Sequence, residues 1–259
     1  MNLINKKDGR GGERRFFSGV LLLSLSTVIV KLIGLGFKIP MLSFLGAEGM
    51  GYFNSAYTLY GFFYIISAAG LPKSVTMVIT ENTVDKEKQY SIFNYLIKLS
   101  FLTGLVLSGV FFILSPAFSY FLGSKSTLMS LMFIAPSILF VAVSGVARGY
   151  LNANMNFIPI AIAQVIEGAV KLVVGLGLAL LGKKLLLPLE AISGLTVLGI
   201  TIGSLLSLVF MLKFTKNRET GYKPRQNCCF DKKETIKKIV KIADIIVQRL
   251  RIGYYNLVK

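Results

Sequence analysis

The sequence predicts an all-α, polytopic membrane protein built as a bundle of six transmembrane helices. Of its 259 residues, 54% are hydrophobic, and the mean hydropathy is +0.67, which is typical of a membrane protein and not of a soluble domain. Six apolar stretches are each long enough to cross a bilayer, since roughly 20 residues cover a 30 Å hydrocarbon core. The net charge of +17 gathers at the ends of these stretches and in a few loops. That distribution indicates membrane topology and argues against a nucleic-acid partner.

The first helix is expected over residues 19–45, after a disordered, positively charged cytoplasmic tail formed by residues 1–15. It carries Lys31 near its middle and Lys38 seven residues later. Seven residues make almost two helical turns, so both side chains leave from nearly the same face. A lysine at mid-bilayer costs about 2.5–3.5 kcal/mol on insertion scales. Lys31 is therefore expected to face a water-filled cavity or an anionic partner, whereas Lys38 either does the same or extends to the interface.

A turn over residues 46–51 leads to a second apolar segment, residues 52–79. Gly70-Leu71-Pro72 interrupts this segment, because Pro72 removes a backbone hydrogen bond, and Lys73 follows the break directly. Freed backbone groups in a membrane are tolerated where they line a cavity or pack against protein. Four more helices are expected at residues 92–114, 128–151, 159–181 and 188–212. The first of these four ends near Ser115-Pro116.

Helices so close in sequence form antiparallel hairpins. Small residues spaced four apart fit close helix crossings, as at Gly145/Gly149 and Gly199/Gly203. Such pairs are common in glycine-rich apolar chains, so they support packing and say nothing about substrate.

Lysines and arginines are concentrated in alternate loops on one side of the bundle, whereas the opposite side offers only Lys125, Lys183 and Lys184. The positive-inside rule then places the N-terminus and residues 213–241 in the cytoplasm of a cell-membrane protein. We assign the six-helix lobe to residues 16–214 and a cytoplasmic loop to residues 215–235. Residues 236–259 carry an apolar stripe opposed by basic side chains. They are predicted to form a basic amphipathic helix on the inner leaflet.

The residue types favour transport over catalysis. The sequence contains no histidine, which argues against imidazole chemistry and against histidine metal sites. Its two cysteines, Cys228 and Cys229, are adjacent in a basic loop and are expected to be reduced thiols. The sequence shows no nucleophile–base pair, phosphate-cradling loop or metal-ligand cluster. We therefore expect a transport-type bundle with a basic interior, no enzyme activity and no cofactor.

One polar stripe crosses the fifth predicted helix. Gln164, Glu167 and Lys171 lie at spacings that share a helix face, and Glu167 precedes Lys171 by four residues, the favourable order for an ion pair. The pair either neutralises itself inside the bundle or gates a cavity and carries a coupling ion. Arg148, near the end of the fourth helix, is either a cytoplasmic anchor or a contact for an anionic head group.

Two groups of motifs resemble a known family. They are LGAEGMGY from Leu45, AY at Ala56 and AGLPKS from Ala69, and then RGYLN from Arg148, Pro159, QVIE from Gln164 and Lys171. In this order they are similar to polysaccharide transporters of the stage V sporulation protein B type. Those proteins belong with the MurJ-type lipid II flippases in the multidrug/oligosaccharidyl-lipid/polysaccharide exporter superfamily. The resemblance covers about residues 17–243.

The resemblance implies a membrane flippase for undecaprenyl diphosphate-linked saccharides of cell-wall or polysaccharide biosynthesis. Such a protein moves its substrate from the inner to the outer leaflet by alternating access between two six-helix lobes. Lys31 matches a basic position that faces the central cavity, which makes it the best candidate for the lipid diphosphate. Lys38, Lys73 and Arg148 are further candidates for that cavity, and the stripe at Gln164, Glu167 and Lys171 is a candidate for coupling or gating.

The chain departs from the family pattern near its end. Family members carry around fourteen membrane helices, whereas beyond Asp244 the expected seventh helix is replaced by IIVQRLRIGYYNLVK. We expect an N-terminal lobe only, either a genuine half-transporter or the product of a frameshift. Its partners would be membrane lipid, the lipid-linked saccharide, and a separate C-terminal lobe or a second copy.

Two alternatives stay open. A drug/cation antiporter of the same superfamily would favour an acidic cavity, whereas Lys31, Lys38 and Lys73 favour an anionic substrate. A non-transporting remnant or half-size scaffold is the other alternative. In a full-length version of the protein, Lys31→Ala is predicted to abolish function.

Overall fold

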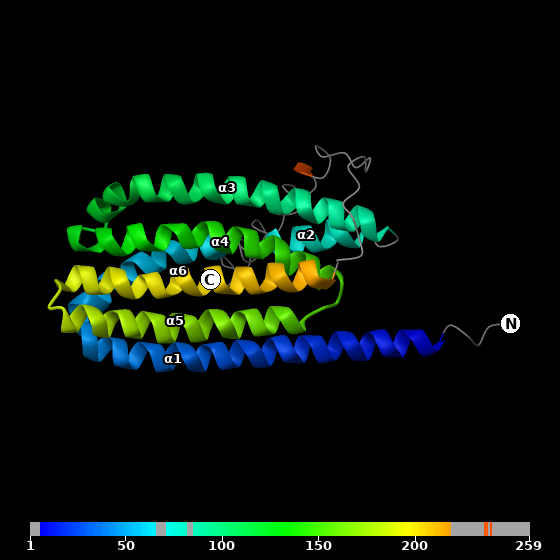
Figure 1. Cartoon of the computed structure of the whole chain (residues 1–259), viewed down its shortest axis with the longest axis horizontal. Helices are drawn as coiled ribbons and strands as arrows, with labels where there is room; N and C mark the ends of the chain where they lie inside the picture. Colours follow the sequence, from blue (N-terminus) through cyan, green and yellow to red (C-terminus); the bar gives the residue numbers. More distant parts are fainter. Residues whose placement is uncertain (1–5, 66–70, 82–84, 219–235, 238, 240–259) are drawn as a thin grey trace, which may run out of the picture.

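The computed structural model describes residues 6–65, 71–81, 85–218, 236, 237 and 239 (Figure 1). Long helices run side by side, and their order across the bundle is α3, α4, α6, α5, α1 (Figure 1). The most extensive contacts join α5 to α6, α3 to α4, α4 to α6 and α1 to α5. The described elements are α1 (Lys6–Ile65), α2 (Leu71–Thr80), α3 (Lys86–Phe121), the 3₁₀ turn η2 (Lys125–Thr127), α4 (Leu128–Ala153), α5 (Ile158–Lys184) and α6 (Leu189–Arg218).

Helix α1 is two antiparallel arms in one continuous element. Gly46 has φ 64° and ψ −173°, a backbone conformation that is essentially restricted to glycine, and the ribbon reverses direction there (Figure 1). The rings of Phe37 and Phe53 lie 5.7 Å apart, centroid to centroid, although 16 residues of straight helix would separate them by about 24 Å. We call residues 6–45 the first arm and residues 47–65 the second arm.

Five helices among the described residues are long and apolar enough to cross a membrane, so the chain is a multi-pass membrane protein. The predicted six are therefore not confirmed by this count. The first of the five, Phe17–Phe62, contains both arms of α1. The expected second helix corresponds to the second arm and to the short helix α2, which begins at Leu71 with Pro72 in its first turn. Residues 66–70 between them lie outside the described residues.

Several helix ends differ from the prediction. Helix α3 begins at Lys86, earlier than expected, because the Asp85 side chain accepts a hydrogen bond of 3.0 Å from the backbone N–H of Lys88 and caps the first turn. It also continues through Pro116 to Phe121. A proline inside a membrane helix is tolerated where neighbouring groups satisfy the freed backbone. Residues 6–15, expected to be a disordered tail, are the start of α1, since adding turns to an existing helix is easier than starting one.

The outer faces of the bundle are apolar. Helix α3, at one edge of the bundle, exposes large side chains along its length, among them Phe101, Leu102, Val106 and Ile113. In water such a surface would be unfavourable, but it suits contact with lipid chains. Inside, one core cluster is centred on Met41, Phe53 and Leu131, and a second on Val75, Phe93 and Tyr150.

Glycines set the closest helix approach. A Cβ at Gly199 would lie 2.6 Å from the Gly175 backbone, and a Cβ at Gly203 would lie 2.8 Å from the Glu167 carbonyl oxygen. The predicted packing role of Gly199 and Gly203 is thus confirmed at the crossing of α6 over α5. The predicted amphipathic helix, residues 236–259, and the loop at residues 215–235 lie largely outside the described residues.

Candidate functional site

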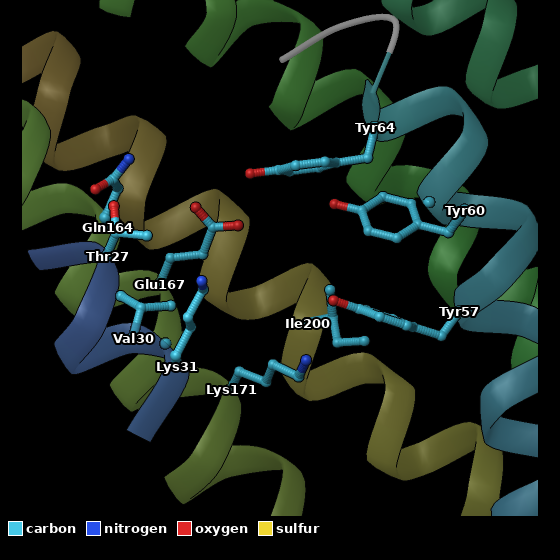
Figure 2. Close-up of a pocket in the computed structure, with 12 residues that line it drawn as sticks. Thr27, Val30, Lys31, Tyr57, Tyr60, Tyr64, Gln164, Glu167, Lys171 and Ile200 are labelled. Atoms are coloured by element: carbon cyan, nitrogen blue, oxygen red, sulfur yellow. The ribbon is translucent and has the colours of Figure 1, made fainter. Parts of the chain in front are cut away.

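A cavity of about 360 Å³ opens between the two arms of α1 and helix α5, with α6 behind it (Figure 2). Both arms of α1 and the helices α5 and α6 contribute residues to its lining. The first arm gives Thr27, Val30 and Lys31; the second arm gives Tyr57, Tyr60, Gly61 and Tyr64; α5 gives Gln164, Glu167, Gly168 and Lys171; and α6 gives Ile200. The cavity is therefore polar and charged on the α5 side and aromatic on the side of the second arm.

The predicted polar stripe of α5 does line this cavity. Gln164, Glu167 and Lys171 share one helix face by their spacing, and all three border the cavity. The glycines of α6 fix their place, since Gly203 packs on the backbone of Glu167 and Gly199 on that of Lys171. On the opposite side, the hydroxyl of Ser26 lies 2.9 Å from Oε1 of Gln164 and joins the first arm to α5.

Glu167 is paired with Arg148 of α4. The guanidinium Nη2 lies 3.1 Å from Glu167 Oε2, and the two side chains are 11% and 21% exposed. Helices α4 and α5 meet at few other points, because α6 packs between them (Figure 1). Arg148 does not lie at the end of α4, as a cytoplasmic anchor would, but five residues before it, in the bundle interior. Its charge is matched by Glu167.

Lys171 does not form the predicted ion pair with Glu167. Within the described part of the chain, its Nζ instead lies 4.5 Å from the ring centroid of Tyr57 and 5.2 Å from that of Phe37. Such cation–π contacts are worth about 0.5–2 kcal/mol, depending on how far the cation is desolvated. The prediction failed because helix spacing allows the i, i+4 pair but cannot show a stronger partner on another helix. For Glu167 that partner is Arg148, with which it forms an ion pair.

Lys31 is one of the residues that line the cavity. It leaves the first arm beside Val30, and its ammonium group is directed toward the side where Glu167 stands (Figure 2). Lys31 is exposed in the described structure, which is consistent with a cavity that is open on one side.

The other two predicted lysines lie elsewhere. Lys38, two helical turns beyond Lys31, and Lys73, on α2, are both exposed, and neither lines the cavity. Their assignment to the substrate stays a prediction.

The tyrosine wall is the feature that sequence reasoning missed. Tyr57, Tyr60 and Tyr64 recur at intervals of three and four residues, so they share one face of the second arm. Their hydroxyls point into the cavity (Figure 2), and neighbouring ring centroids lie 6.1 Å and 5.8 Å apart. The spacing was available in the sequence as a signal, but it could equally have marked a core stripe.

The site holds no group of three potential metal ligands among the described residues. What the arrangement can do is hold an anion. Its lining carries two lysines and one carboxylate, and the arginine behind that carboxylate matches it. Ammonium groups in a partly enclosed cavity bind phosphate-like anions as point charges.

Comparison with known proteins agrees with the fold and indicates a family. A family model described as "Polysaccharide biosynthesis protein" matches residues 16–252. The chain is similar to stage V sporulation protein B of Bacillus subtilis (strain 168), with 24% identity over 213 residues, which is 80% of this chain and 40% of that protein. It is also similar to the lipid II flippase MurJ of the same organism, with 22% identity over 170 residues, 61% of this chain and 31% of that protein. The chain thus spans less than half the length of these relatives.

Solved structures share the arrangement of helices. A crystal structure of MATE in complex with MaD3S superposes with a TM-score of 0.73 at 16% identity, covering 88% of this chain and 51% of that one. A MOP superfamily transporter from Pyrococcus furiosus gives a TM-score of 0.70 at 15% identity, covering 87% of this chain and 50% of that one. At this identity the likeness shows the fold alone.

Proposed function

The chain belongs to the polysaccharide biosynthesis protein family, and on that premise we propose that it forms one lobe of a flippase for lipid-linked saccharides. Its substrate would be an undecaprenyl diphosphate-linked oligosaccharide or a lipid II-type precursor, moved from the inner to the outer leaflet by alternating access. The names of two relatives, a stage V sporulation protein and a lipid II flippase, support this substrate class. The N-terminus would face the cytoplasm of a cell-membrane protein.

The observation that carries the proposal is the uncompensated positive charge of the cavity. Glu167 is paired with Arg148, which leaves Lys31 and Lys171 as cations without a matching carboxylate in the described lining. A lipid diphosphate would supply the missing anion. A charged group in a medium of low dielectric constant gains more from such pairing than it would in water.

The same observation disfavours the cation antiporter. A cation substrate would need a free carboxylate, and Glu167 is the acidic residue of the described lining. If a cation substrate took the place of Arg148 at that carboxylate, the buried guanidinium of Arg148 would be left without a counter-ion, which is costly.

Alternating access requires a second lobe opposite the cavity. Further sequence of the same protein, a separate C-terminal lobe or a second copy of this chain could each provide it. A half-size scaffold without transport is the alternative. The mass of the complex in nanodiscs shows whether a second lobe or a second copy is bound. A single lobe that also binds no lipid diphosphate would support the scaffold.

The test is lipid binding by native mass spectrometry of the full chain, with undecaprenyl diphosphate and phosphatidylglycerol as competing probes. We expect a preference for the diphosphate, and Lys31→Ala should weaken that binding about tenfold, the effect of one lost charge-assisted contact. Lys98→Ala is the matched control, because Lys98 is exposed on the distant helix α3. Equal binding of both lipids would contradict the proposal, and preferential binding of a cationic drug would favour the antiporter.

Lys38 and Lys73 are proposed to meet the head group outside the cavity, on its way in or out. Their alanine variants should therefore weaken binding less than Lys31→Ala. In a full-length, two-lobed version of the protein, Lys31→Ala should abolish complementation of a flippase-depleted strain at an unchanged membrane level.

A further inference from the structure

Lys171 covers the most accessible ring of the cavity wall. Its Nζ lies 4.5 Å from the Tyr57 ring centroid, and Tyr57 is 42% exposed whereas Tyr60 is only 3% exposed. Figure 2 shows the Lys171 side chain reaching from α5 toward Tyr57 across the cavity. The ring that a ligand could reach most easily is therefore partly occupied by a side chain of the protein itself.

The Lys171 side chain is held in place by aromatic rings and not by a counter-ion. Glu167, four residues away on the same helix, is committed to Arg148 at 3.1 Å. Among the described residues, Lys171 makes no ion pair, and its contacts are with Tyr57 and with Phe37. A phosphate oxygen attracts an ammonium group more strongly than the face of an aromatic ring does. An anion entering the cavity would therefore draw Lys171 away from Tyr57.

We propose that Lys171 is a displaceable cover over a saccharide-binding face of Tyr57, removed by the phosphate group of the incoming ligand. This inference rests on the proposed function and specifies how the same cavity binds the phosphate and the sugar of one substrate. The phosphate forms an ion pair with the Lys171 ammonium group. The Tyr57 ring face that this uncovers carries negative charge density and stacks against the C–H groups of a pyranose. The hydroxyl of Tyr64 and the amide of Gln164 border the same space and can hydrogen-bond sugar hydroxyls.

The arrangement makes saccharide binding depend on the phosphate. A neutral glycoside finds the Tyr57 face covered, whereas a diphosphate without sugar gains the ammonium contact only. A ligand that carries both groups gains both contacts. The cavity thereby selects against free sugars and against bare lipid diphosphate.

The experiment uses the full chain in nanodiscs and three probes with the same farnesyl chain. They are farnesyl diphosphate, farnesyl diphospho-N-acetylglucosamine and the neutral farnesyl N-acetylglucosaminide, and calorimetry measures their dissociation constants. In the wild type, the sugar should tighten diphosphate binding about tenfold, while the neutral glycoside binds weakly. Tyr57→Leu should remove the tightening by the sugar and leave farnesyl diphosphate within about twofold.

Lys171→Ala is the decisive variant, because it removes both the charge and the stem that lies over the Tyr57 ring. It should weaken farnesyl diphosphate binding about tenfold and tighten binding of the neutral glycoside severalfold, an opposite pair of effects that general structural damage does not produce. Lys183→Ala is the matched control, since Lys183 lies 5.8 Å from the ring centroid of Phe44, outside the cavity lining.

The outcomes separate this inference from the proposed function. If Lys171→Ala weakens diphosphate binding but leaves binding of the neutral glycoside unchanged, Lys171 is an ordinary anion contact and the proposal that it covers Tyr57 is overturned. If the wild type binds farnesyl diphosphate and farnesyl diphospho-N-acetylglucosamine equally, the proposal that Tyr57 binds the saccharide is overturned while the flippase proposal stands. If the wild type binds no diphosphate, both are overturned.

Discussion

The guanidinium of Arg148 lies 3.1 Å from the carboxylate of Glu167, and this ion pair joins α4 to α5 across the edge of α6. Both side chains are largely removed from solvent, at 11% and 21% exposed. The pair therefore connects two helices that touch little elsewhere. It also decides which charges of the cavity remain available to a ligand.

Breaking this pair on one side should destabilise the protein. Glu167→Gln leaves the Arg148 cation buried without its carboxylate, and the expected cost is about 3 kcal/mol of unfolding free energy. Unfolding in mixed detergent micelles measures it. Glu87→Gln, at an exposed position in the first turn of α3, should change stability by less than about 1 kcal/mol. The double variant Arg148→Met/Glu167→Leu should recover most of the loss, and equal instability of single and double variants would contradict the pairing.

Contact between α5 and α6 should tolerate no side chain at Gly199. A Cβ there would lie 2.6 Å from backbone atoms of Gly175, which cannot move aside as a side chain can. We expect Gly199→Ala to lower stability by about 1–3 kcal/mol and to weaken lipid diphosphate binding, because Lys171 shifts with its helix. Gly177→Ala on α5 is the control, since nothing lies within 4 Å of its added Cβ. It should be neutral or stabilise by up to about 1 kcal/mol.

The reversal of α1 should require glycine at position 46. Nothing lies within 4 Å of a Cβ at Gly46, so Gly46→Ala tests backbone strain alone. Its φ of 64° with ψ −173° should cost about 1–3 kcal/mol for alanine. Gly51→Ala, also without a neighbour within 4 Å but in regular helix, is the matched control. Equal thermal stability of the two variants would argue against the backbone conformation described at Gly46.

The start of α3 should depend on its cap. Asp85→Ala removes the acceptor for the Lys88 N–H, and we expect a loss of about 0.5–2 kcal/mol. Asp85→Asn and Asp85→Ser retain a capping oxygen and should lose much less. Amide hydrogen exchange over residues 86–90 reports the effect locally, and unchanged protection in the alanine variant would contradict the capping role.

Much of the cavity could be predicted from sequence, because helix periodicity fixes which residues share a face. Lys31 and the stripe at Gln164, Glu167 and Lys171 were placed by spacing and by the cost of burying charge in a membrane, and all of them border the cavity. The packing role of Gly199 and Gly203 followed from small residues at a fixed interval. These features depend only on local geometry.

What could not be predicted depends on how one helix is rotated against another. The partner of Glu167 is set by the position of Arg148 on α4, and no spacing within α5 contains that information. The boundary of α3 was misjudged for a different reason. Pro116 ends helices in water, whereas in a bilayer the surrounding backbone has no better alternative to helical hydrogen bonds, and the helix continues.

The turn at Gly46 also sets the register between the two arms. Helical residues advance by about 100° each, so one inserted residue between Gly46 and Phe53 would rotate the rest of the second arm by that angle. Tyr57 would then leave the reach of Lys171, and the ring pair of Phe37 and Phe53 would separate. Substitutions that keep Gly46 can preserve the cavity, but insertions and deletions cannot. The length of residues 46–53 is therefore a specificity determinant in its own right, and variation among relatives should occur there by exchange of residues at constant length.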